Sequence, residues 1–180
     1  MPGTGFPDVH VPAGGSPVIG GGASFRRILV PVDPFGRCAA ALTLAGRLSL
    51  TVGGMLRLIH VRAWDPPARG GMGRFYLQTS EEATALLDTA LTGLWACGAA
   101  ASGMVVDAPR PLTAAAIAAE ASSWGADVMV VARRRRRALG VLLFGSLSDQ
   151  VMQETQCPVL VVRQVRSDPS SFHGGRNAKR

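Results

Sequence analysis

The sequence predicts an α/β protein: a five-stranded parallel sheet with helices on both faces. Three observations support this fold class. Short runs rich in Val, Leu and Ile, such as ILVPV at 28–32, lack polar alternation and are typical of strands buried on both faces. Between these runs lie segments with apolar residues at helical spacing. The two kinds of segment alternate strictly, which favours parallel strands joined by right-handed crossovers.

The first strand is expected at Arg26–Asp33. It is followed by Asp33-Pro34, which has the pattern of an N-cap and a proline at the first helical position. The first helix is predicted by an apolar stripe made of Cys38, Ala41, Leu42, Ala45 and Leu48. Gly53-Gly54 is expected to end this helix.

The second strand is expected at Met55–Trp64, before a long connection at 65–78 that is rich in Gly and Pro. Thr79 and Glu82 have the spacing of a capping box and predict the start of a second helix. Its apolar stripe consists of Ala83, Leu86, Leu87, Ala90, Leu91 and Leu94.

The same alternation continues to the end of the folded part. The expected elements are a strand at 102–108, a helix at 111–125, a strand at 126–133, a helix at 146–155 and a last strand at Cys157–Arg163. In such sheets, ligands bind outside the carboxyl ends of the strands, where the strand order reverses. Asp33 after the first strand and the stretch after the fourth strand are therefore the candidate site.

The two ends of the chain differ in composition from the middle. Residues 1–24 are rich in Gly and Pro, and residues 164–180 form a basic tail. Neither offers enough apolar surface to offset the entropy of ordering, so we expect one domain at 25–163 with disordered ends. Residues 1–24 lack the pattern of a signal peptide, and no apolar run reaches the ~18–20 residues of a membrane span. We expect a soluble, cytoplasmic protein with no membrane partner.

The formal charge of +7 is unevenly distributed. Of the 19 Lys and Arg residues, five form Arg133–Arg137, and seven others lie near the two boundaries of the folded part. A nucleic-acid surface more often spreads basic residues over one face and alternates them with aromatic residues. The arginine run is therefore either a solvated loop or a site for a polyanion or nucleotide.

Four stretches resemble the universal stress protein family. They are ILVPVD (28–33), LIHV (58–61), GADVMVVAR (125–133) and LLFGSLSDQVMQETQCPVLVVR (142–163). The resemblance covers about residues 25–163. It implies a Rossmann-like fold of the adenine nucleotide alpha hydrolase type, with strand order 3-2-1-4-5. It also implies a dimer, a role in the stress response, and no established catalysis in most members.

The nucleotide-binding branch of that family carries G-x2-G-x9-G-[ST] after the fourth strand. Gly145 and Ser146 match the end of this motif, but its first two glycines fall on Ala132 and Arg135. A loop that wraps phosphates needs inward N–H groups, often at positive φ, and a residue with a Cβ costs roughly 1–2 kcal/mol there. The match predicts a degraded phosphate site.

Other positions of the site also follow from the resemblance. Asp33 would accept hydrogen bonds from adenine or ribose, and Val61 would offer a backbone contact. Arg134 matches an arginine common in the loop, and Ser148 is the second serine of the GS-x-S signature. The family's D-G-S after the first strand reads Asp33-Pro34-Phe35 here, which weakens the match. From the residues alone, Asp33 could equally be a helix cap, and Gly145-Ser146 a simple helix entry.

Cysteines, histidines and spaced glycines often mark disulfides, metal sites or phosphate loops, but here each lacks the spacing or the further residue that such a site needs. The cysteines have no paired spacing and are interpreted as reduced core or interface thiols: Cys38, Cys97 and Cys157. His60 shares no metal-ligand spacing and is interpreted as a core histidine. Gly140 and Gly145 have the P-loop spacing without its lysine. No nucleophile–base or paired-carboxylate pattern stands out, so we expect no enzyme activity.

These observations favour a stress-response binding or regulatory module whose nucleotide site is degraded, with weak or no ATP binding. One alternative is a member that binds ATP and hydrolyses it slowly, with arginine side chains in place of backbone N–H groups as phosphate donors. Another is a basic protein associated with nucleic acid. In every case, the apolar last strand, Cys157–Arg163, is expected to lie at a sheet edge and to form a homodimer.

Overall fold

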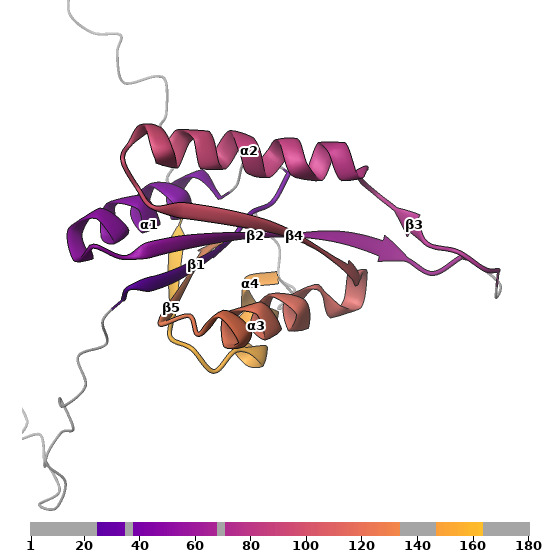
Figure 1. Cartoon of the computed structure of the whole chain (residues 1–180). Coiled ribbons are helices and arrows are strands. Elements are labelled where there is room, and N and C mark those ends of the chain that lie inside the picture. The colour runs from indigo at the N-terminus through magenta and orange to yellow at the C-terminus, as the bar shows by residue number, and fades with distance from the viewer. Residues whose placement is uncertain (1–24, 35–37, 68–70, 134–146, 164–180) are drawn as a thin grey trace, which may run out of the picture.

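The computed structural model describes residues 25–34, 38–67, 71–133 and 147–163 (Figure 1). Its strands are β1 (Arg27–Pro31), β2 (Met55–Asp65), β3 (Phe75–Tyr76), β4 (Ala101–Pro109), β5 (Val128–Arg133) and β6 (Val159–Arg163). Its helices are α1 (Ala39–Val52), α2 (Ser80–Ala96), the short 3-10 helix η2 (Arg110–Leu112), α3 (Thr113–Trp124) and α4 (Leu147–Glu154).

Five strands form a parallel sheet in the order β4-β2-β1-β5-β6. Numbered along the chain without β3, this is the predicted order 3-2-1-4-5, so the α/β fold class is confirmed. β1 lies at the centre, with β2 on one side and β5 on the other. The order reverses between β1 and β5, which makes their carboxyl ends the switch point of the sheet.

The sheet carries one strand that the sequence did not predict. β3 pairs antiparallel with the far end of β2, through Trp64 opposite Tyr76 and Asp65 opposite Phe75. It belongs to the segment expected to be an irregular connection. β2 and β3 form a hairpin that extends beyond the rest of the sheet (Figure 1).

Helices cover both faces of the sheet, α1 and α2 on one and α3 and α4 on the other (Figure 1). Residues of β1 alternate between two apolar clusters: Ile28 and Val30 pack toward α1 and α2, and Leu29 packs toward α3 and α4. All three are fully buried. The absence of polar alternation in this strand is thus explained by helices on both of its sides.

The helix boundaries test the sequence signals. The Thr79–Glu82 capping box is present at α2, and Gly53 ends α1 in the left-handed conformation, at φ 63°. The predicted helix cap at Asp33 is wrong, because α1 begins at Ala39 and its N-cap residue is Cys38. The apolar stripe that starts at Cys38 packs on the sheet, and this packing sets the helix start in place of the Asp-Pro signal.

Candidate functional site

The candidate site lies beyond the ends of β1 and β5, beside the part of β2 that continues past β1. Asp33 lies two residues after the end of β1 and is partly buried. Since α1 begins six residues later, a role in capping that helix no longer accounts for Asp33. The carboxyl ends of parallel neighbours lie at one edge of the sheet, so Asp33 shares this edge with the end of β5 and with the residues of β2 just past Ile59, the partner of Pro31.

Val61 presents its backbone toward the same place. In a strand, backbone groups two residues apart face the same neighbour. The carbonyl of Ile59 accepts a hydrogen bond from the Val32 N–H at 2.8 Å, so Ile59 faces β1. Val61 therefore points its N–H and C=O past the last residue of β1, while its side chain packs in the cluster under α3 and α4.

Ala132 lies inside β5, where it pairs with Val162 of β6. Its methyl group packs against the cluster under α1 and α2. A residue in a strand ladder is extended, so the left-handed strain that we assigned to Ala132 is wrong. Only the bulk of its Cβ distinguishes it from glycine at this position.

Ser148 is buried in the first turn of α4. Four further predicted site residues lie outside the described residues: Arg134, Arg135, Gly145 and Ser146. The structure thus brings Asp33, the Val61 backbone and Ala132 to one edge of the sheet.

Next to this edge, His60 is buried, with 3% of its surface exposed. Its Nδ1 lies 2.9 Å from the carbonyl oxygen of Val32, and its Nε2 lies 2.6 Å from the amide oxygen of Gln78. The interpretation of His60 as a core histidine is confirmed. Its contacts with the last turn before α2 and with the end of β1 were not predicted.

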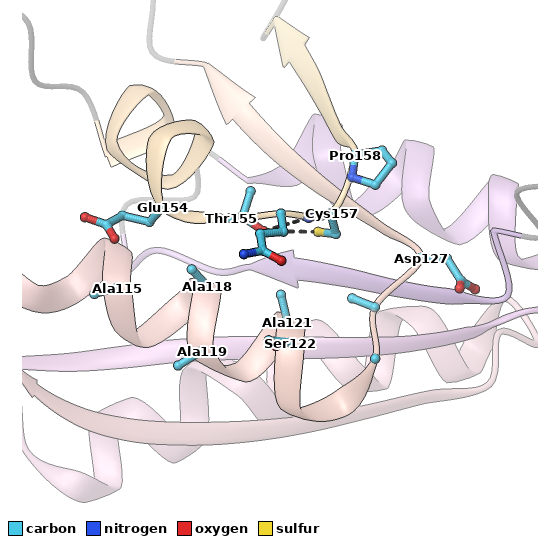
Figure 2. Close-up of a pocket in the computed structure, with 13 residues that line it drawn as sticks. Ala115, Ala118, Ala119, Ala121, Ser122, Asp127, Glu154, Thr155, Cys157 and Pro158 are labelled. Atoms are coloured by element: carbon cyan, nitrogen blue, oxygen red, sulfur yellow. Dashed lines mark hydrogen bonds between the residues drawn. The ribbon is translucent and has the colours of Figure 1, made fainter. Parts of the chain in front are cut away.

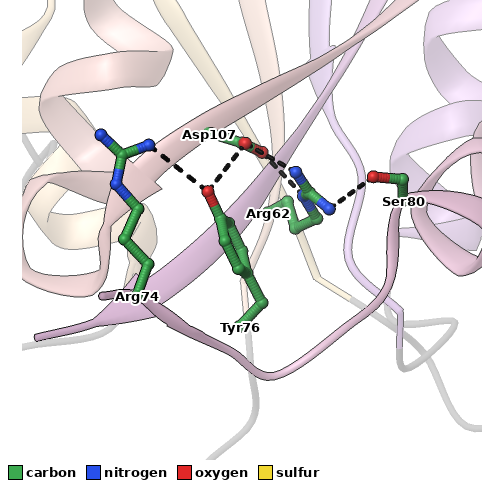
Figure 3. A network of polar contacts seen from close by, with 5 residues as sticks. All are labelled: Arg62, Arg74, Tyr76, Ser80 and Asp107. Carbon is green, nitrogen blue, oxygen red and sulfur yellow. Dashed lines mark hydrogen bonds and ion pairs between the residues drawn. The ribbon is translucent and has the colours of Figure 1, made fainter. Parts of the chain in front are cut away.

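A polar network holds the hairpin onto the sheet (Figure 3). Arg62 and Asp107 are cross-strand neighbours, and the guanidinium donates two hydrogen bonds to the carboxylate, at 2.7 and 2.6 Å. Arg62 also bonds the Ser80 hydroxyl at 2.6 Å and lies 4.2 Å from the centre of the Tyr76 ring. The Tyr76 hydroxyl donates to Asp107 at 3.0 Å. Sequence reasoning missed this network because its members come from distant segments.

Hydrogen bonds within this network set the charge state of its carboxylate. The bonds from Arg62 hold the pKa of Asp107 below its ordinary value, against an opposing effect of burial. The Tyr76 hydroxyl and the charges of Arg62 and Arg74 act in the same direction as the Arg62 bonds. A second pair, Arg110 with Asp65, lowers the pKa of Asp65 in the same way. Both carboxylates are therefore ionised and engaged at neutral pH.

A cavity of about 690 Å³ runs along α3 (Figure 2). Alanines of α3 form one wall, and the turn from α4 to β6 forms the other. Asp127 lies at its end, where the carboxylate accepts hydrogen bonds from the backbone N–H groups of Arg26 and Arg27 at 2.9 and 2.8 Å. Because Asp127 precedes β5 and Pro158 precedes β6, the cavity reaches the amino ends of these strands. It is therefore distinct from the candidate site.

Two further expectations concern the state of the cysteines and membrane-spanning helices. All three cysteines are free, with Cys38 buried, Cys157 partly buried and Cys97 exposed. Burial raises the pKa of the Cys38 thiol, which lies next to Asp33. Among the described helices, none has the length and apolar character needed to cross a membrane.

Comparison with family models and known proteins identifies the family of this chain. The family model described as the Universal stress protein family matches residues 24–163. The chain belongs to the universal stress protein family. No curated protein matches it.

Solved structures of universal stress proteins share the fold. A family member from Burkholderia pseudomallei aligns with a TM-score of 0.58 and 21% identity, over 78% of this chain and 98% of that one. The Archaeoglobus fulgidus protein in complex with dAMP gives 0.56 and 20%, over 76% and 97%. A universal stress protein in complex with cAMP gives 0.58 and 20%, over 77% and 97%. At these identities, the likeness shows the fold.

Proposed function

We propose that this universal stress protein is a non-enzymatic binding or regulatory module that retains the base-and-ribose half of a nucleotide site and has an altered phosphate half. It binds ATP weakly or not at all. The observation that carries the proposal is Arg135 in place of the second glycine of the family's phosphate motif. The retained half is supported by Asp33, at the switch point, and by the Val61 backbone of β2, which faces the space beyond the end of β1.

The expected weakening now rests on one position. Ala132 is extended, so it adds no left-handed strain. A residue with a Cβ at a left-handed loop position costs about 1–2 kcal/mol, which corresponds to about a 5- to 30-fold loss of affinity at Arg135. Neighbouring arginines offset part of that loss by pairing with phosphate, but a guanidinium–phosphate pair gives little discrimination for adenine.

A second candidate is an ATP-binding protein that uses arginine side chains as phosphate donors. Two observations favour it: the unstrained backbone at Ala132, and the dAMP and cAMP complexes of structurally similar proteins. In this version, arginines are needed for affinity. In the version that we propose, Arg135 lowers affinity.

Calorimetry with ATP at physiological salt distinguishes the two versions. We expect Arg135→Gly to bind ATP about 5- to 30-fold more tightly than the unmodified chain. Ala132→Gly is the matched control and should give little gain. Tight, adenine-selective binding by the unmodified chain that is lost in Arg135→Gly would overturn the proposal and establish the arginine-based site. Nucleotide released when the purified protein is denatured gives an independent answer.

A further inference from the structure

His60 is one of three buried polar or charged residues among those described, together with Ser49 and Ser148. A buried ring nitrogen without a partner is costly, and both nitrogens of His60 have one. Nδ1 meets the Val32 carbonyl and Nε2 meets the Gln78 amide. The ring thus connects Val32, just beyond the end of β1, with Gln78, just before α2. Neither residue belongs to a strand or a helix.

The first of these segments is the exit of β1. The β1–β2 ladder ends at Pro31, one residue before Val32. Beyond the ladder, both polar backbone groups of Val32 are held by β2: the N–H by the carbonyl of Ile59, and the carbonyl by the ring of His60. Asp33 is the next residue. Two consecutive residues of β2 therefore set where the chain leaves the sheet.

The second segment is the start of α2. Gln78 precedes Thr79, the N-cap of that helix, and Ser80 follows it. His60 bonds Gln78, and Arg62, on the same face of β2, bonds Ser80. Two side chains of β2 thus hold the residues on either side of Thr79, at the start of α2. This fixes the position of Gln78, and Gln78 in turn supports the ring of His60.

We infer that His60 is a positioning residue for the nucleotide site, holding the Val32 carbonyl so that Asp33 points to the space beyond β1. The inference rests on the proposed function, because it assigns Asp33 to the base-and-ribose half of that site. A carbonyl only accepts hydrogen bonds, so the ring carries a proton on Nδ1. Nε2 lies against the Gln78 amide oxygen, so it donates there when the ring carries a proton on both nitrogens; in a neutral ring the Gln78 amide must be turned so that its NH2 group donates to Nε2.

The unmodified chain provides the first test. Nitrogen-15 NMR of the imidazole identifies which ring nitrogen of His60 carries a proton. We expect a proton on Nδ1 that exchanges slowly with solvent. An unprotonated Nδ1 could not donate to Val32 and would overturn the inference, whether or not any nucleotide binds.

Two conservative variants provide the second test. The side-chain nitrogen of His60→Asn stands where Nδ1 stands, and that of His60→Gln reaches the place of Nε2. We expect His60→Asn to preserve the amide NMR signal of Asp33 and the affinity for adenosine, a probe without phosphate. His60→Gln should shift that signal and weaken adenosine binding about tenfold, because the bond that preorganises Asp33 is lost.

The outcomes separate the inference from the proposed function. If both variants leave the Asp33 signal and adenosine affinity unchanged, or both change them equally, His60 has no positioning role. If the unmodified chain does not bind adenosine, the base-and-ribose half of the proposed function fails. In that case the Nδ1 proton and the Asp33 signal still decide whether His60 positions the end of β1.

Discussion

Arg62 and Asp107 face each other directly across β2 and β4, and the guanidinium of Arg62 spans both oxygens of the Asp107 carboxylate. The Arg62 side chain is 16% exposed. Arg110 and Asp65 make a similar paired contact, but there the two side chains are 51% and 41% exposed. Two Arg–Asp ion pairs at one end of the sheet thus differ in how exposed their arginine side chains are. Mutating the arginine of each pair gives a matched comparison.

Arg62→Met is expected to destabilise the protein more than Arg110→Met. Loss of Arg62 leaves Asp107 without its main partner and removes the contacts to Ser80 and Tyr76, whereas exposed pairs contribute little. Urea denaturation of both variants measures the difference. Equal losses would show that the Arg62 network does not hold the hairpin.

The stability of the hairpin should depend on acid pH through Asp107. Its pKa in the folded protein lies below the ordinary 3.8, so the ionised form is favoured by folding. This contribution to the free energy of unfolding is fully present above about pH 3.8. It is lost as the pH falls through the pKa that Asp107 has in the folded protein. Unfolding midpoints between pH 5 and 2 should therefore fall less steeply in Asp107→Asn, which has no charge to lose, than in the unmodified chain. Parallel curves for the two proteins would contradict this assignment.

Two glycines should respond oppositely to alanine. Gly93 lies inside α2, and an added Cβ meets no atom within 4 Å, so Gly93→Ala should stabilise the protein by about 0.5–1 kcal/mol. At Gly54 the Cβ would lie 3.0 Å from the backbone carbonyl oxygens of Phe25 and Arg26. Gly54→Ala should therefore destabilise by about 1–3 kcal/mol. Thermal unfolding checks both, and a gain at Gly54 would show that the segment before β1 can move away.

The last strand is expected to form a two-fold homodimer. Among the described residues β6 pairs with β5 only, and Leu160 is 39% exposed on it. A charge at Val161 would disturb the core as well, because Val161 packs under α3 and α4. Leu160→Lys is the cleaner change, and Leu112→Lys on η2, at the opposite edge of the sheet, is its control.

Light scattering at micromolar concentration measures the assembly. We expect dimers for the unmodified chain and for Leu112→Lys, and monomers for Leu160→Lys, because like charges would face each other across the two-fold axis. A monomeric unmodified chain, or a dimer unaffected by Leu160→Lys, would rule out this interface.

The parallel sheet could be predicted because its strands are covered on both faces. Ile28, Leu29 and Val30 are all fully buried, and a continuous apolar run of this kind is typical of a strand that lies between two layers of helices. The Thr79–Glu82 capping box was also predictable, since all its atoms lie within one turn. The start of α1 was not, because Asp33-Pro34 is a short signal that competes with the packing of an apolar stripe on the sheet.

The hairpin and the support of the site depend on contacts between distant segments. β3 has two residues in a stretch rich in Gly and Pro, and its place is fixed by Tyr76 meeting Arg62 and Asp107. Asp33 could be placed from the end of its strand, and Val61 from the resemblance to the family. The contact of His60 with Val32 could not, because no pattern in β2 shows where the carbonyl of a neighbouring strand will stand.

The most direct test of the altered phosphate site compares ATP with inorganic tripolyphosphate on the unmodified full chain, by calorimetry at two salt concentrations. We expect both to bind weakly and to weaken together as salt rises, because the arginines recognise phosphate charge; ATP should bind more tightly than tripolyphosphate only by the contribution of the retained base-and-ribose half. Tight ATP binding that persists at high salt, with no binding of tripolyphosphate, would contradict the account.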